Sequence, residues 1–180
     1  RAAVERALER TGRDAIDLLQ VHAWRYCDPS WLDSVFALDE LRREGLIRHL
    51  GLTNVDTAHL RVLLHSGVRV ASNQVCYSLI DRRPSGGMAA LCLEHGVKLL
   101  AYGTLAGGFL SERWLGAAEP SQEELTTWSL MKYRRFIDAA GGWEAYQRVL
   151  SAAADVAERR GISIANVASR FVLDDPAVAA

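Results

Sequence analysis

The stretch Asp17-Leu18-Leu19-Gln20-Val21-His22 is a short apolar run that ends on an imidazole side chain. It follows Gly12, which in turn follows a segment with helical spacing. A glycine just past a helix readily adopts the left-handed conformation that ends helices, and an apolar run of strand length after it is typical of a buried parallel strand. The stretch therefore predicts a helix followed by a parallel strand whose carboxyl end carries His22.

The same pattern recurs three times further along the chain. Gly45, Gly67 and Gly96 each precede an apolar run, and these runs end at Thr53-Asn54, at Asn73-Gln74 and at Tyr102. Repeated βα units favour either a doubly wound sheet or a (β/α) barrel, and both place the functional site at the carboxyl ends of the strands. We therefore expect one polar face that contains His22, Thr53, Asn54, Asn73, Gln74 and Tyr102.

The composition is that of a globular protein with one domain over residues 1–180. Of the 180 residues, 49% are hydrophobic, and the net charge is -1. A basic stripe for nucleic acid is absent from the sequence, and every apolar run is shorter than the ~20 residues that cross a bilayer. The cysteines are odd in number and lack C-x-x-C spacing, which argues against a disulfide framework and a zinc site and favours a cytoplasmic setting. We expect a protein without nucleic-acid, membrane or metal partners.

The two ends of the sequence favour a segment of a longer chain. Residues 1–10 have the spacing of an amphipathic helix but no initiator methionine and no N-cap. Residues 176–180 end where another strand is expected to begin.

Candidate capping residues place several helices. Ser30 with Asp33 resembles a capping box, and Asp56 and Ser163 are expected to be N-caps. Residues 111–142 have no regular pattern, which predicts a long insertion that serves as a lid or binding loop.

Two loops and one pair of amide side chains have both a ligand-binding and a packing interpretation. In residues 23–29, Trp24 and Tyr26 either shape a substrate pocket or pack against neighbours. In residues 102–110, the glycines either let backbone N–H groups approach a phosphate or make the loop flexible. Asn73 and Gln74 either satisfy backbone groups or hold a ligand amide.

Several motifs, in their order along the chain, together resemble the aldo-keto reductase family. They are residues 17–22, 51–54, 73–83 and 100–108. The resemblance implies a partial (β/α)8 barrel with parallel strands, of which this chain supplies about strands 4 to 7 with their helices. It also implies NADP, or less often NAD, as the cofactor of a hydride transfer between nicotinamide and a small-molecule carbonyl or alcohol substrate.

The resemblance assigns roles residue by residue. His22 matches the histidine that orients the substrate carbonyl, and Asn54 and Gln74 match the pair that binds the nicotinamide carboxamide. Thr53 stands where serine is commoner, and Tyr102 matches the residue that stacks on the nicotinamide ring. The pyrophosphate-facing loop is matched by the backbone of Gly103, Thr104 and Leu105, and the substrate pocket by Trp24, Tyr26 and Tyr77.

The family's proton-donating tyrosine and its assisting lysine and aspartate match no residue of this sequence. We therefore expect the segment to lack reductase activity by itself. One alternative is a truncated, non-catalytic barrel homologue that acts as a binding or interaction module. Another, based on the glycines after Tyr102, is a different (β/α) barrel enzyme that handles a phosphorylated substrate.

Overall fold

The computed structural model describes residues 1–23 and 25–180, which divide into two compact units. The first unit contains Arg1–Val75 and Gly87–Leu100, and the second contains Cys76–Gly86 and Ala101–Ala180. Among the described residues, we find no helix with the length and apolar character that a membrane span needs.

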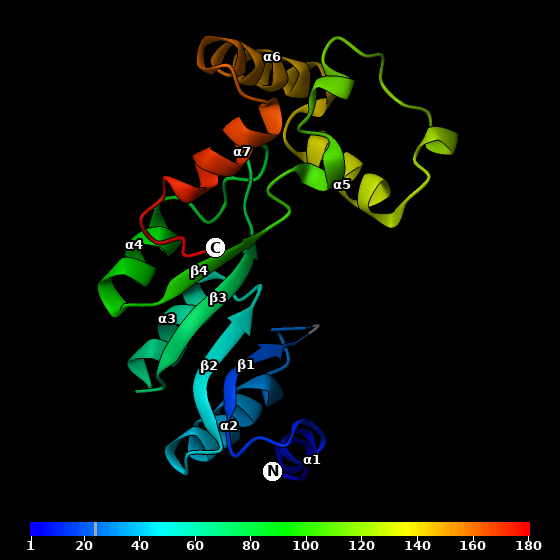
Figure 1. Ribbon diagram of the computed structural model, residues 1–180. Helices are drawn as coiled ribbons and strands as arrows, with labels where there is room; N and C mark the ends of the chain where they lie inside the picture. Colours follow the sequence, from blue (N-terminus) through cyan, green and yellow to red (C-terminus); the bar gives the residue numbers. More distant parts are fainter. Residues whose placement is uncertain (24) are drawn as a thin grey trace. The chain divides into compact units, whose positions relative to one another are not determined.

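Helices and strands alternate through the first part of the chain, as the glycine-terminated pattern predicts. They follow one another as α1 (Ala2–Thr11), β1 (Ile16–His22), α2 (Ser30–Arg43), β2 (Ile47–Thr53), α3 (Thr57–His65), β3 (Val70–Cys76), α4 (Gly87–His95) and β4 (Lys98–Tyr102). The sheet order is β1-β2-β3-β4 (Figure 1). Strand β2 pairs in parallel with both β1 and β3. The predicted α/β class with parallel strands is therefore confirmed.

The beginning of the first unit shows how the pattern produces this structure. Gly12 ends α1 in the left-handed conformation, with φ 64°, and its backbone N–H donates to the Leu8 carbonyl. The reversal lets the apolar side of α1 pack on the sheet, where Val4 and Leu8 join Leu41 and Ile47 in one buried cluster. Burial of this apolar surface holds α1, α2 and β2 together.

Two of the predicted helix caps are confirmed. The Asp56 side chain accepts from the backbone N–H of His59 at 2.9 Å, and the Ser163 hydroxyl accepts from the backbone N–H of Asn166 at 3.1 Å. Burial alone would raise the pKa of Asp56, but the hydrogen bonds from His59 lower it below the usual value. The carboxylate therefore stays ionised at the positive end of α3.

The predicted capping box at Ser30 is wrong. Pro29 already has helical backbone angles and is itself the N-cap of α2, so Ser30 lies inside the helix. The Asp28 side chain instead accepts from the Ser30 backbone N–H at 3.0 Å.

The second unit is helical. It contains α5 (Trp128–Ala139), α6 (Gly142–Arg160), α7 (Ile164–Leu173) and the 3-10 turns η1 (Ala106–Gly108), η2 (Glu112–Trp114) and η3 (Gln122–Glu124). Its core combines aliphatic and aromatic side chains, and Phe109 and Tyr146 are among the fully buried ones. Near the chain end, Val178 is an isolated β-bridge residue. The Ala101 backbone N–H donates to the Ala180 carbonyl at 2.5 Å.

The expectation of an irregular segment over residues 111–142 is wrong for its second half, which forms α5. The Thr127 hydroxyl caps this helix, and Tyr133 and Ile137 are buried on its inner side. A charged residue, Arg134, is also buried there, because it forms ion pairs with Glu119 and Asp138. A buried arginine interrupts the apolar spacing by which a helix is recognised in a sequence.

Candidate functional site

Polar side chains of the first unit form a row at the carboxyl ends of its strands. His22 lies opposite Thr53 in the β1–β2 pairing, and Thr53 lies opposite Gln74 in the β2–β3 pairing. Residues paired in a parallel sheet point to the same face, so these three side chains share one face. The sequence suggested that the third strand ends at Asn73-Gln74. Strand β3 instead continues to Cys76, so Gln74 lies inside the strand.

Asn73 does not belong to this row, and the expectation that it would is wrong. Successive residues of a strand face opposite sides, so Asn73 points away from Gln74. Its side chain is fully buried, donates to the Val55 carbonyl at 2.8 Å and accepts from the Val55 backbone N–H at 3.4 Å. Asn73 therefore satisfies the backbone that leaves β2.

Asn54 follows β2 in a left-handed conformation, with φ 57°. Asparagine is among the few residues other than glycine that tolerate this conformation. The backbone N–H of Asn54 donates to the Gln74 carbonyl at 2.8 Å. The two amide-bearing residues, Asn54 and Gln74, are thus tied together through their backbones.

A second glutamine contacts Gln74. The Gln20 side-chain Nε2 donates to the Gln74 Oε1 at 3.1 Å. Gln20 was not among the predicted site residues, although it lies two residues before His22 and therefore faces the same side of β1. Alternation within the strand is the signal that could have identified it.

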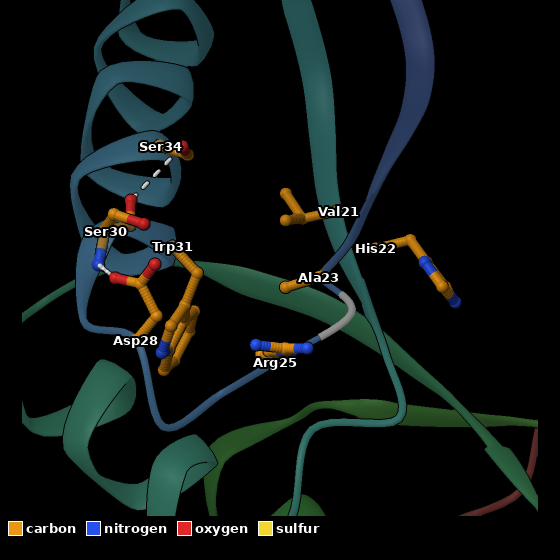
Figure 2. Close-up of a pocket in the computed structure, with 8 residues that line it drawn as sticks. All are labelled: Val21, His22, Ala23, Arg25, Asp28, Ser30, Trp31 and Ser34. Carbon is orange, nitrogen blue, oxygen red and sulfur yellow. Dashed lines mark hydrogen bonds between the residues drawn. The ribbon is translucent and has the colours of Figure 1, made fainter.

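His22 is the last residue of β1, and a cavity of about 410 Å³ lies beside the end of this strand. Figure 2 shows the His22 ring on the opposite side of the strand from Val21, which points toward α2. Arg25 and Trp31 also line the cavity. Trp24, which the sequence assigns to the substrate pocket, lies outside the described residues.

Tyr26 fastens the loop after β1 to the end of β2. Its hydroxyl donates to the Thr53 carbonyl at 2.5 Å, and its ring meets Trp31 edge to face with the ring centroids 5.0 Å apart. Burial raises the pKa of Tyr26, which keeps this hydroxyl protonated as a donor. The packing interpretation of Tyr26 is thus observed, and its contact with substrate stays a prediction.

In the second unit, Tyr102 ends β4 and its ring contacts a lysine. The Lys132 Nζ lies 4.7 Å from the Tyr102 ring centroid and 5.0 Å from the Tyr133 ring centroid. Both distances are within the range of a cation–π interaction. Lys132 was not predicted from the sequence, because the segment that forms α5 was expected to be irregular.

The loop after Tyr102 is held against the same helix. Gly103 has φ 71°, and a side chain at this position would overlap the Tyr133 hydroxyl. Within the part of the chain that the structure describes, the backbone N–H groups of Thr104 and Leu105 donate to no carbonyl. Such groups can bind an anion.

Tyr77 is packed within the second unit. Its side chain is 3% exposed, its hydroxyl donates to the Asp175 carboxylate at 3.0 Å, and its ring meets Phe171 edge to face. Its predicted contact with substrate stays a prediction.

Parallel βα units with polar side chains at the carboxyl ends of their strands define an α/β protein, a class that includes doubly wound sheets and (β/α) barrels. The family model for the Aldo/keto reductase family matches residues 1–180, and the chain therefore belongs to that family. The family predicted from the motifs is thus confirmed.

Known relatives and solved structures agree with this assignment. The protein tas of Escherichia coli is 32% identical over 200 residues, which cover 99% of this chain and 56% of that protein. The structure of a glycerol dehydrogenase from Gluconobacter oxydans matches with a TM-score of 0.77 and 26% identity, covering 98% of this chain and 52% of that one. An aldo/keto reductase from Klebsiella pneumoniae, in complex with NADP and acetate, matches with a TM-score of 0.65 and 25% identity, covering 98% and 51%. The chain spans about half the length of these relatives.

Proposed function

We propose that the protein is an oxidoreductase that transfers a hydride between NADP(H) and a small-molecule carbonyl or alcohol substrate, with NAD(H) as the alternative cofactor. The observation that carries this proposal is the row His22, Thr53 and Gln74 with Asn54 beside it. Membership of the Aldo/keto reductase family supports it, and so does the NADP bound to the Klebsiella pneumoniae relative.

The chemistry of these residues fits a nicotinamide nucleotide. The nicotinamide carboxamide is uncharged and carries both a hydrogen-bond acceptor and a donor, and the amides of Asn54 and Gln74 offer both complements. In the second unit, the Tyr102 ring offers a face for stacking, and the N–H groups of Thr104 and Leu105 suit an anionic pyrophosphate. When bound, the nicotinamide supplies or accepts the hydride.

His22 has the role of orienting the substrate. An imidazole at the strand end can donate a hydrogen bond to a carbonyl oxygen and hold it for reduction. Reduction leaves negative charge on that oxygen, so a proton donor must also lie within hydrogen-bond reach. No residue of the chain matches the family's tyrosine donor, and we propose that residues 1–180 alone bind cofactor groups without catalysing turnover.

The experiment is a steady-state assay of the full-length protein with NADPH and a panel of aldehydes and ketones, followed by the absorbance of the reduced nicotinamide. We expect saturable oxidation of NADPH that the His22→Ala variant loses while it still binds the nucleotide. Failure of the full-length protein to bind either NADPH or NADH contradicts the proposal. Binding without turnover of any substrate supports the alternative of a non-catalytic binding module.

A further inference from the structure

One cation lies against the tyrosine ring on which the nicotinamide is proposed to stack. The Lys132 Nζ lies over the Tyr102 ring, 4.7 Å from its centroid. We propose that Lys132 sets the preference of the site for one oxidation state of the cofactor, because its positive charge disfavours the cationic ring of NADP⁺ and not the neutral ring of NADPH. This inference rests on the proposed function and extends it to the choice between the two forms of the cofactor.

Three aromatic rings surround the ammonium group. Besides Tyr102, the Tyr133 ring centroid lies 5.0 Å and the Phe136 ring centroid 5.9 Å from the Lys132 Nζ. Tyr133 is only 7% exposed, and its hydroxyl fills the space that a side chain at Gly103 would need. The cage formed by Tyr102, Tyr133 and Phe136 therefore keeps the charge beside Tyr102, although the lysine side chain is exposed.

The lysine covers one face of the Tyr102 ring and leaves the other for a ligand. Lys132, like two of the rings that surround its ammonium group, belongs to α5. The face of the Tyr102 ring toward this helix is therefore occupied. Tyr102 is only half-buried, so a nicotinamide can stack on the opposite face. The Tyr102 ring then lies between the ammonium group and the nicotinamide.

Neighbouring carboxylates do not cancel the charge of Lys132. Within residues 1–23 and 25–180, none forms an ion pair with it. Arg83, whose guanidinium lies over the Phe136 ring, differs in this respect. It is paired with the buried Asp81 through N–O distances of 2.8 and 2.7 Å. The charge of Arg83 is therefore largely compensated, whereas that of Lys132 acts on a ligand at Tyr102.

The two cofactor forms differ by one unit of charge on the nicotinamide ring, which is positive in NADP⁺ and neutral in NADPH. Stacked rings have centroids at least ~4.5 Å apart, so the ammonium group acts on the ligand ring across ~9 Å. With an effective dielectric constant between that of a protein surface and that of water, one pair of charges at this separation changes an affinity by about fivefold. Attraction of Lys132 to the phosphates is common to both forms and cancels in the ratio of their Kd values.

The test measures the Kd of NADP⁺ and of NADPH for the full-length protein by calorimetry without substrate, so that the readout is independent of turnover. Lys132→Met removes the charge and keeps an unbranched apolar side chain between the rings. The ratio of the NADP⁺ Kd to the NADPH Kd should fall by about fivefold relative to the wild type. Lys132→Gln is a second neutral variant and should give the same result. Lys132→Arg keeps the charge and should leave the ratio within about twofold of the wild type.

Lys98→Met is the matched control, because it removes the same charge from an exposed side chain at the other end of β4. Lys98 and Tyr102 are separated by ~13 Å of strand, which exceeds the screening length at physiological salt. The control should leave the ratio unchanged.

A ratio that neither neutral variant lowers, or that Lys98→Met lowers equally, overturns the inference. Equal weakening of both forms by Lys132→Met also overturns it, since that result assigns Lys132 to phosphate binding or packing. If the wild type binds neither NADPH nor NADH, it is the proposed function that fails.

Discussion

Replacing Gly51 by alanine tests the close approach of three strands on the face that carries the candidate site. The added methyl group would lie 2.7 Å from the Ser72 Oγ, 3.0 Å from the Gln20 Cγ and 3.2 Å from the Leu18 Cδ1. The last two atoms belong to exposed side chains that can move aside, but Ser72 is short and 5% exposed. Overpacking of this kind destabilises the fold by ~1–3 kcal/mol. Replacing glycine by alanine also restricts the unfolded chain, which stabilises the fold by ~0.4–1 kcal/mol. We therefore expect Gly51→Ala to lower the free energy of unfolding by ~1–2 kcal/mol.

Urea unfolding of the full-length protein measures this change, and the chain offers a matched control and a rescue. A Cβ at Gly87 would have no atom within 4 Å, so Gly87→Ala should be neutral or slightly stabilising. Among the described residues the Ser72 hydroxyl has no hydrogen-bond partner, so Ser72→Ala should cost little and should relieve most of the defect of Gly51→Ala. A Gly51→Ala variant as stable as the wild type, or a defect that Ser72→Ala does not relieve, would refute the close approach of these strands.

Three further predictions concern stability and reactivity. Tyr26→Phe removes the hydrogen bond of 2.5 Å to the Thr53 carbonyl. It should lower the free energy of unfolding in urea by ~1 kcal/mol. An unchanged free energy of unfolding would show that this hydrogen bond does not stabilise the fold. Native alkylation at about pH 8, read by peptide mass spectrometry, should label the exposed Cys27 and spare Cys76, because a thiol whose pKa is well above the pH is almost entirely protonated and unreactive. Burial raises the pKa of Cys76 to about 11, and equal labelling of the two thiols would show that Cys76 is accessible. Burial alone would raise the pKa of Asp81, but hydrogen bonds from a neighbouring arginine lower it below the unfolded value. The ionised Asp81 therefore stabilises the fold above the unfolded pKa, and this contribution is lost as the pH falls through the folded pKa. Asp81→Asn should reduce the fall of the free energy of unfolding at acid pH. An unaltered dependence of that free energy on pH would contradict this role.

The alternating architecture could be predicted from the sequence because each unit repeats one local signal, a glycine followed by a short apolar run. Two details could not be predicted for physical reasons. Polar residues at Asn73 and Gln74 suggested that the third strand had ended, but the pairing with β2 continues through both. Helix α5 was hidden because Arg134 interrupts its apolar spacing, and the burial of Arg134 depends in part on an ion pair with Glu119, which lies outside the helix.

The candidate site was predicted in part. His22, Thr53, Asn54 and Gln74 follow from their places near strand ends and from the family motifs. Gln20 did not follow, because its contact depends on the register of three strands and on the missing side chain of Gly51, and no local pattern reports such a register.

The most direct test of nicotinamide binding at these strand ends compares two ligands of the full-length protein by calorimetry. One is NADP, and the other is 2′-phospho-ADP-ribose, which has the same phosphates and adenosine but lacks the nicotinamide. Gln74→Leu should weaken the binding of NADP by about tenfold and leave the binding of 2′-phospho-ADP-ribose within about twofold of the wild type. Equal weakening of both ligands, or no change in either, would contradict the assignment of Gln74 to the nicotinamide carboxamide.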